Sequence, residues 1–269
     1  MLQLGRFELR RNPHSGDLRL LVAGSTLYQG ILKRAFPRVV VSHAFESQDE
    51  RFHWGCYLKG VSDQDEVGLR LFCRLLQKAV FIHDDLDECF ALGMHSERRE
   101  DGTVGKAEFG ELVYRSKPYN RTTHPGSKVA SRSLAERLAR FVKAHPTYGR
   151  ADLLVPVPPS NADKDFDLPT LLVQDMSSSS GVPCRIGVVR KARQTAPMKS
   201  CVTEAEKIRN VQGAYVVSST PIRGRSVILV DDIYQSGATL NEVARSLRKA
   251  GAAEVLGLVA TKTLKGVRP

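Results

Sequence analysis

Two adjacent carboxylates, Asp231 and Asp232, stand between an apolar run and a short glycine-bearing loop. The apolar run, Val227 to Val230, consists of four branched residues without a polar face, which predicts a strand buried on both sides. The loop 234–239 is followed by a pattern that places apolar residues of 240–247 on one face, which predicts a helix. The order is therefore strand, acidic pair, small-residue loop and helix.

This order predicts a place where a sugar phosphate is held. The N–H groups of the loop and the positive end of the helix dipole would receive a phosphate, with the hydroxyls of Ser236 and Thr239 as further donors. Asp231 and Asp232 would repel phosphate and suit sugar hydroxyls or a magnesium ion. The alternative is a buried strand with an acidic C-terminal turn and an N-capped helix that binds no ligand.

The apolar run, the acidic pair and the S-G-A-T loop resemble the phosphoribosyl pyrophosphate (PRPP) motif of type I phosphoribosyltransferases. The resemblance implies that Asp231 and Asp232 lie against the ribose hydroxyls and are the catalytic pair. It also implies that five consecutive residues cradle the 5'-phosphate. These are Gln235, Ser236, Gly237, Ala238 and Thr239.

Length and composition place the chain among globular proteins. Its 269 residues suffice for one large domain or two small ones, and the hydrophobic share of 42% is ordinary. No apolar run reaches the roughly 20 residues of a membrane-spanning helix, and residues 1–11 lack the apolar core of a secretory signal. We therefore expect a cytoplasmic protein without a membrane partner.

The five cysteines are an odd number at wide spacings, with no CxxC pair among them. This predicts reduced, mostly structural thiols and argues against a disulfide framework or a thiolate zinc site. His83, Cys89 and His95 match no familiar metal spacing either.

The net charge of +11 is unevenly placed along the chain. Residues 1–110 hold 15 Lys and Arg against 16 Asp and Glu, whereas residues 111–269 hold 25 against 13. One explanation is a surface for nucleic acid, and another is a site for a polyanionic substrate. Charge alone does not decide between them.

Residues 1–110 predict a smaller α+β region that precedes the main domain. Turn residues 12–16 join two predicted hairpin strands, and 66–79 predicts a helix. Asp84 and Asp85 offer a second acidic site, but Asp85 to Glu88 suit the first turn of a short helix better. The charged, glycine-containing segment 94–110 predicts a loop or linker and marks the expected domain boundary.

Residues 111–269 predict a doubly wound parallel sheet because strands alternate with helices. The expected strands are 153–157, 185–189, 215–217, 227–230 and 255–260. Ser133 and Glu136 form a possible capping box for a helix that has an apolar face and a basic face. The basic face is either a solvated surface or a track for phosphates. It carries Arg132, Arg137, Arg140 and Lys143, and Lys117, Arg121 and Lys128 lie upstream.

With these elements in order, residues 111–263 resemble the ComF family of phosphoribosyltransferase-like proteins. The resemblance lies in the PVP motif at 156–158, in Arg190 with Gln194, in the string 209–215 and in the block 230–242. It implies a diphosphate-binding loop at Pro158, Pro159, Ser160 and Asn161, and a flexible loop with Lys191, Arg193 and Gln194. It also implies Mg²⁺ as the cofactor, held through the diphosphate and by Asp231 and Asp232.

Two departures from that family change what the resemblance implies. Its members usually begin with a four-cysteine zinc module, which residues 1–110 lack, so that metal and the associated partner role do not carry over. The family's Arg-Gly-Phe-Asn-Gln element is replaced by the acidic segment 163–167, which weakens the case for catalysis more than the case for the fold.

The sequence therefore predicts a protein that binds PRPP or a nucleotide 5'-phosphate and transfers a phosphoribosyl group to or from a nitrogenous base. The alternative is a non-catalytic, nucleic-acid-associated protein of DNA uptake, repair or defence, in which the basic C-terminal half contacts nucleic acid. A third possibility is a scaffold that binds no ligand. A homo-oligomer is compatible with each, and residues 1–110 are candidates for the hood over the acceptor base.

Overall fold

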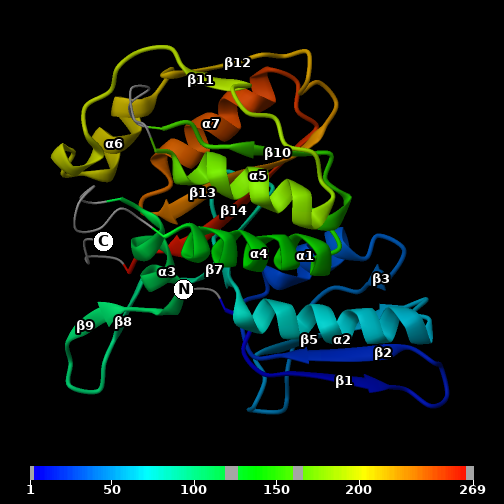
Figure 1. The fold of residues 1–269 in the computed structure, drawn as a ribbon. Coiled ribbons are helices and arrows are strands. Elements are labelled where there is room, and N and C mark those ends of the chain that lie inside the picture. The colour runs from blue at the N-terminus through cyan, green and yellow to red at the C-terminus, as the bar shows by residue number, and fades with distance from the viewer. Residues whose placement is uncertain (1–2, 119–126, 160–165, 265–269) are drawn as a thin grey trace.

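The computed structural model describes residues 3–118, 127–159 and 166–264. Two five-stranded sheets dominate these residues, one antiparallel near the N-terminus and one largely parallel (Figure 1). Helices lie between the sheets and on the outer side of the parallel sheet. None of the helices in these ranges has the length and apolar character that crossing a membrane requires.

The antiparallel sheet has the order β1-β2-β5-β3, and β4 also pairs with β5. Its strands are β1 (Phe7–Arg11), β2 (Leu18–Val22), β3 (Val40–Val41), β4 (Phe45–Glu46) and β5 (Trp54–Lys59). Alternation along these strands directs Leu9, Leu20 and Cys56, which are partners in register, into the core. The predicted hairpin across the turn 12–16 is confirmed.

Two helices contribute to the core on the inner face of this sheet. Helix α1 (Tyr28–Ala35) buries Ile31 and Leu32. Helix α2 (Asp63–Lys78) begins at a capping box between Ser62 and Asp65, and it buries an apolar stripe. The outer face of the sheet carries the polar residues of the same strands.

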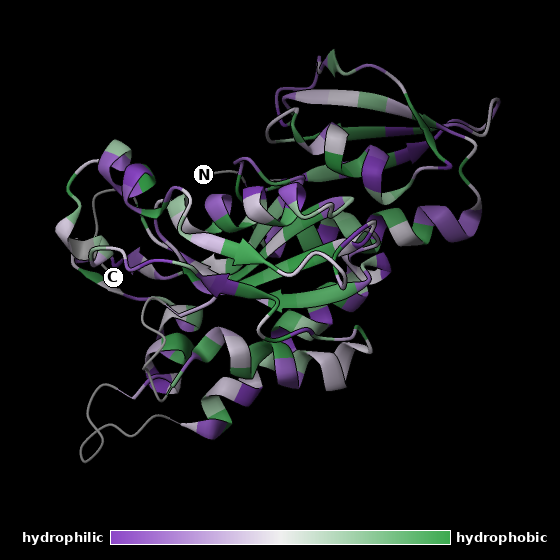
Figure 2. Cartoon of the chain, turned by 90° about the horizontal axis from the view of Figure 1, so that it is seen from above, coloured by the Kyte–Doolittle hydropathy of each residue, from purple (hydrophilic) through white to green (hydrophobic). Residues whose placement is uncertain are grey.

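The largely parallel sheet has the order β10-β13-β14-β7-β6. Its strands are β6 (Val80–Phe81), β7 (Glu88–Met94), β10 (Leu153–Pro156), β13 (Ser226–Tyr234) and β14 (Glu254–Lys262). β10, β13, β14 and β7 pair in parallel, and only β6 runs antiparallel to its neighbour. Figure 2 shows these strands as a hydrophobic layer inside more polar helices.

Residues of β13 alternate between the two sides of the sheet, as a buried parallel strand requires. Ile228 and Val230 pack in the core that includes α4 (Lys128–Ala144) and α5 (Leu168–Ser180). Val227 and Leu229 pack in the second core, which includes α7 (Ala238–Lys249). The prediction of a doubly wound parallel sheet with a strand buried on both sides is therefore confirmed.

The segment before residue 110 also supplies strands to this sheet. The first turn of a short helix predicted at 85–88 is wrong, because residues 88–94 form β7 and pair with β14. The Asp87 carboxylate instead accepts a hydrogen bond from the Val255 N–H (2.9 Å) and pairs with Arg248 (3.0 Å). The division of the chain at residue 110 stays a prediction.

Three other elements differ from their predicted form, namely helix α4, the segment 94–110 and the strand expected at 185–189. Helix α4 begins at Lys128 with Ser127 as N-cap, so Ser133 lies inside it and forms no cap. The segment 94–110 is a hairpin rather than a loop, with strands β8 (Ser96–Arg98) and β9 (Val104–Lys106). Helix α3 (Glu108–Ser116) follows it at once.

The strand predicted at 185–189 lies later, as β11 (Val189–Lys191), because Gly187 adopts a positive φ of 74° that interrupts extended backbone. β11 pairs antiparallel with β12 (Tyr215–Val217) in a separate ribbon. Helix α6 (Glu204–Val211) and two short turns of 3₁₀ helix, Tyr148–Arg150 and Met198–Ser200, complete the described elements.

Candidate functional site

The acidic pair lies near the carboxyl end of β13, between two parallel neighbours. β13 continues through the pair to Tyr234, four residues beyond the predicted strand 227–230, because Ile233 and Tyr234 pair with Thr261 and Lys262 of β14. Both carboxylates are partly buried, and the Asp232 N–H donates a hydrogen bond to Asp231 Oδ1 (2.8 Å). In open α/β sheets this edge is where ligands bind.

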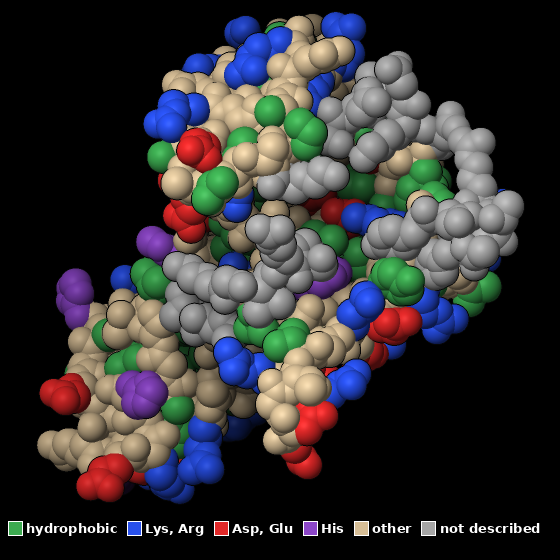
Figure 3. Space-filling model, turned by 90° about the vertical axis from the view of Figure 1, so that its left-hand side faces the viewer, with side chains coloured by type: hydrophobic (Ala, Val, Ile, Leu, Met, Phe, Trp, Pro, Cys, Tyr) green, Lys and Arg blue, Asp and Glu red, His purple; other side chains and the backbone are tan. Residues whose placement is uncertain are grey.

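A lysine from another part of the chain contacts the pair. Lys117, the residue that follows α3, places its ammonium against the Asp232 carboxylate. The two side chains are only 26% and 14% exposed, so this contact is partly shielded from water. In the space-filling view of this end, acidic and basic side chains lie side by side in a hollow (Figure 3).

Two further polar residues support the backbone of Asp232. Thr261 on β14 donates its hydroxyl to the Asp232 carbonyl (3.3 Å), and His95 Nδ1 lies 3.1 Å from the same hydroxyl oxygen. His95 is buried, and burial together with the nearby Lys117 ammonium lowers its pKa. His95 is therefore a neutral, positioning neighbour of the site at neutral pH.

Burial and the adjacent Asp232 carboxylate raise the pKa of Asp231 well above its usual range. Two adjacent carboxylates do not both ionise easily. The protonated form of Asp231 is therefore favoured, and the Lys117 ammonium lies against Asp232. An acidic pair of this kind can accept hydrogen bonds from sugar hydroxyls at Asp232 and exchange a proton at Asp231.

The predicted phosphate loop leads directly into α7. Gly237 precedes the helix with φ +75°, and its carbonyl accepts the Asn241 N–H (2.8 Å). A Cβ at Gly237 would lie 2.2 Å from Tyr234 Oη, so both its conformation and its surroundings require glycine. The first turn of α7 contains no acidic residue. This helix end therefore keeps its positive dipole available for an anion.

The other predicted phosphate-binding residues differ in accessibility. Gln235 is exposed, Ser236 and Thr239 are partly buried, and Ala238 is buried, so Ala238 offers only its backbone. Thr239 lies close enough to Tyr215 of β12 to lower the pKa of that phenol, against the burial that raises it. The loop therefore lies beside β12, a strand of the β11–β12 ribbon.

That ribbon carries the residues predicted for a flexible loop. Lys191 is the partner of Tyr215 in register, so the ribbon lies beside the phosphate loop. Arg193 donates hydrogen bonds to the carbonyls of Asn210 (3.1 Å) and Gln212 (2.7 Å). In this conformation Arg193 braces the end of α6, and Gln194 is exposed.

The PVP motif ends β10, the neighbour of β13. Pro156 is the partner of Val230, and the Val157 N–H donates to the Val230 carbonyl (2.9 Å). Pro158 and Pro159 follow at the same edge as the acidic pair and are partly buried. The other two residues of the predicted diphosphate loop, Ser160 and Asn161, lie outside the described residues, as does Arg121 of the predicted basic track.

The residues at this edge fit a magnesium ion only in part. Mg²⁺ prefers oxygen ligands and commonly takes one or two carboxylates together with substrate phosphates. Asp231 and Asp232 supply such oxygens, although Lys117 contacts one of them. Within 3–118, 127–159 and 166–264, no cluster of three or more His, Cys, Asp or Glu could hold a metal by itself. The ion would need oxygens from the ligand.

Sequence reasoning missed the groups that surround the pair. In the sequence Lys117 is only one basic residue among several. Lys117 and His95 precede β13 by more than a hundred residues, and no local pattern links either of them, or Thr261, to that strand. Parallel pairing of β13 with β14 places Thr261 there, and α3 places Lys117.

A family model for the phosphoribosyl transferase domain matches residues 173–262, which include β13, the loop and α7. This stretch is thus similar to the phosphoribosyl transferase domain family. Competence protein F of Haemophilus influenzae is 29% identical over 94 residues, which are 34% of this chain and 41% of that protein. The similarity thus spans less than half of this relative.

Solved structures with a loosely similar arrangement include two phosphoribosyl enzymes. Glutamine PRPP amidotransferase of Bacillus subtilis is 16% identical, with a TM-score of 0.39, over 90% of this chain and 46% of its own. Purine phosphoribosyltransferase of Pyrococcus horikoshii is 17% identical, with a TM-score of 0.33, over 53% of this chain and 80% of its own.

Proposed function

We propose that the carboxyl edge of the parallel sheet binds PRPP or the 5'-phosphate of a nucleotide, and that the protein transfers the phosphoribosyl group to or from a nitrogenous base. The observation that carries this proposal is the acidic pair near the end of the buried β13, followed directly by the Gly237 loop and by a first turn of α7 that holds no acidic residue. The family match over 173–262 supports it.

In the proposed complex the 5'-phosphate lies at the start of α7. It accepts hydrogen bonds from the N–H groups of the loop and from the hydroxyls of Ser236 and Thr239. The ribose lies over the acidic pair, and Asp232 accepts hydrogen bonds from its hydroxyls. Orientation of the sugar in this way lowers the entropic part of the barrier.

The proposed reaction displaces diphosphate from the anomeric carbon by a nitrogen nucleophile. The bond from carbon to the diphosphate oxygen breaks, the bond from carbon to nitrogen forms, and positive charge develops on the ribose in between. The Asp232 carboxylate would stabilise that charge. Pro158 to Asn161 and the cations Lys191 and Arg193 would hold the departing diphosphate. Magnesium, when bound, would neutralise charge on the diphosphate.

The test is release of diphosphate from PRPP in the presence of magnesium and a panel of purine and pyrimidine bases. We expect base-dependent release that is lost in the Asp231→Asn/Asp232→Asn variant. Asp175→Asn, which changes a partly buried aspartate on α5, is the matched control and should keep the activity. PRPP with magnesium should also raise the melting temperature. No release with any base, together with an unchanged melting temperature, would refute the proposal.

A second candidate function, which keeps the pocket without turnover, is association with single-stranded nucleic acid. The exposed side of α4 supports it, because Arg132, Arg140 and Lys143 are exposed there. Arg140 and Lys143 also line a cavity of about 210 Å³ with Ser179, whose carbonyl accepts from Lys143 Nζ (3.4 Å). Binding to single-stranded DNA that weakens steeply with salt, and that Arg140→Ala/Lys143→Ala reduces, would favour this function.

A further inference from the structure

The outer face of the antiparallel sheet carries a cavity that the proposed phosphoribosyl site does not use. It has a volume of about 360 Å³, within the range of small-ligand pockets, and is lined by residues of β1, β2, β5 and the turn that joins β1 to β2. The sheet that holds it is separate from the sheet of the acidic pair. Its ligand chemistry can therefore be considered independently.

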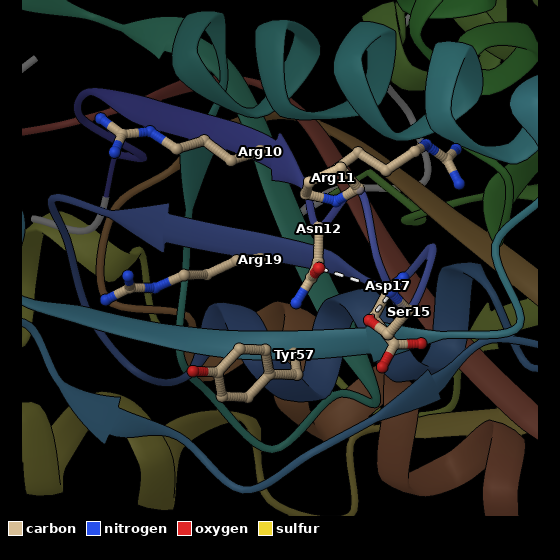
Figure 4. Close-up of a pocket in the computed structure, with 8 residues that line it drawn as sticks. Arg10, Arg11, Asn12, Ser15, Asp17, Arg19 and Tyr57 are labelled. Atoms are coloured by element: carbon tan, nitrogen blue, oxygen red, sulfur yellow. Dashed lines mark hydrogen bonds between the residues drawn. The ribbon is translucent and has the colours of Figure 1, made fainter.

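Three lining residues form a row across neighbouring strands. Arg10 of β1 is the partner of Arg19 of β2, and Arg19 is the partner of Tyr57 of β5. Figure 4 shows the three side chains lying side by side, with their polar ends in the same direction. Like charges directly opposite each other in a sheet are destabilising. An anion between the two guanidinium groups would remove that repulsion.

The two arginines are not equally neutralised. Arg10 pairs with the Glu8 carboxylate on its own strand. Arg19 forms no ion pair with any residue of the described ranges, and its buried Nε lacks a hydrogen-bond partner there. The Arg19 guanidinium lies 5.3 Å from the ring centroid of Phe45, which contributes no counter-charge. Arg19 therefore keeps donors and a charge for a ligand.

An aromatic ring stands at the end of the row. Tyr57 is 46% exposed. Phe45 packs against it with a centroid distance of 5.2 Å, and Phe45 in turn lies over Gly55, where a Cβ would be 2.7 Å from the ring. Glycine at 55 thus allows Phe45 to support Tyr57, which presents exposed ring surface for a planar group.

Oxygen-bearing side chains complete the cavity. Ser15 and Asp17, in the turn before β2, line it together with Asn12 (Figure 4). Hydroxyl and carboxylate oxygens accept hydrogen bonds from sugar hydroxyls and from amino groups of bases. The cavity thus combines cations for an anion, a ring for a planar group and acceptors for neutral donors.

We propose that this cavity is a second ligand site and that its ligand is a nucleoside monophosphate. The phosphate lies against Arg19 and Arg10, the base stacks on Tyr57, and the sugar faces Ser15 and Asp17. A bare anion would leave the ring without a role, and a neutral aromatic compound would leave Arg19 without a partner. The proposal stands whether or not the acidic pair binds PRPP.

The test is isothermal titration of AMP and UMP into the full-length Asp231→Asn/Asp232→Asn protein, in which the proposed phosphoribosyl site is impaired. We expect binding that Arg19→Ala weakens about tenfold or more, as loss of a charged hydrogen-bonding partner does. Tyr57→Ala should weaken it by a similar factor, because it removes the ring on which the base stacks, and Tyr57→Phe should keep most of it. Lys59→Ala, an exposed cation of β5 outside the cavity, is the matched control.

Ribose 5-phosphate and inorganic phosphate test the need for a base. We expect both to bind at least about tenfold more weakly than AMP, because they lose the stacking contribution. Arg19→Gln repeats the charge removal with a longer polar side chain, and equal circular dichroism and melting temperature show that each variant folds. Equal binding of inorganic phosphate and AMP would overturn the proposal, as would AMP binding indifferent to Arg19 and Tyr57. Tighter binding of a single-stranded oligonucleotide through the same two residues would also overturn it.

Discussion

The stability of this protein should depend on pH through a buried pair at the amino edge of the parallel sheet. Glu88, the first residue of β7, is 2% exposed, and its Oε1 lies 3.2 Å from Nε2 of the fully buried His145. The rings of Phe72 and Phe90 pack against the imidazole, with centroids 4.7 and 5.3 Å away. Neither side chain has access to water that would solvate a charge.

Burial shifts the two groups in opposite directions. It raises the pKa of Glu88 from 4.5 to about 8, although Arg34, whose Nε lies 3.4 Å from Glu88 Oε2, favours the charged form. It lowers the pKa of His145 from 6.5 to about 3. At pH 6 the folded protein therefore contains a neutral carboxylic acid beside a neutral imidazole.

The effect on stability follows from the protons that each state binds. Between pH 4.5 and 6.5 the unfolded chain holds one proton on His145 and the folded protein holds one on Glu88, so these two groups produce no pH dependence. From pH 6.5 to 8 only folded Glu88 keeps its proton, and stability falls as the pH rises. From pH 4.5 down to 3 the unfolded chain holds a proton on both groups, whereas the folded protein holds one on Glu88 alone, and stability falls again.

The magnitude follows from the width of each window. One pKa unit corresponds to about 1.4 kcal/mol, so the pair removes about 2 kcal/mol of the free energy of unfolding between pH 6.5 and 8. Glu88→Gln keeps the shape and removes the ionisation. Its stability should therefore stay level over this window, apart from changes at other groups that both proteins share.

Urea unfolding of the wild type and of Glu88→Gln at half-unit steps from pH 5 to 9 measures this difference. Glu136→Gln, at an exposed glutamate of α4, is the matched control and should follow the wild type. The reasoning is wrong if the wild type and Glu88→Gln change in parallel above pH 6.5. That result would mean that Arg34 keeps Glu88 ionised in the folded protein.

Three further predictions concern the acidic pair and its surroundings. Gly237→Ala should lower the free energy of unfolding by roughly 2 kcal/mol or more, by urea unfolding, because it combines a positive φ with a clash at Tyr234; an unchanged value would contradict the close approach. Lys117→Met should increase the affinity for Mn²⁺ alone, by titration calorimetry, because it removes the cation on Asp232, whereas Lys117→Arg should not. Arg193→Ala should lower the free energy of unfolding by about 1 kcal/mol, because two hydrogen bonds to the end of α6 are lost. If the free energy of diphosphate binding falls by more than the free energy of unfolding, Arg193 also contacts the ligand.

The features that follow from neighbouring residues could be predicted from the sequence. A run of four branched apolar residues is compatible with few environments other than a strand between two cores, and β13 lies between two cores. Gly237 precedes a helix with one apolar face, and α7 begins one residue later. In each case the chemistry of a few adjacent residues determines the local structure.

The features that depend on pairing between distant segments could not be predicted from the sequence. The segment 85–88 is acidic and locally suits a helix start, but Glu88 begins a strand because residues 88–94 fill the place beside β14. Ser133 suits a helix cap, but α4 continues through it because Ala130 before it and Leu134 and Leu138 after it are all buried. Tertiary burial outweighed local preference at both positions.

Contacts with distant residues also reduce the repulsion that the acidic pair would exert on a phosphate. Two ionised aspartates would repel the diphosphate and the 5'-phosphate of the proposed ligand, which must approach within a few ångströms of them. In the structure burial favours the protonated form of Asp231, and Lys117 stands against Asp232. The three groups together carry little net charge, so a polyanion can approach this edge of the sheet without strong repulsion. Lys117 would thereby ease the approach of the proposed ligand to the acidic pair.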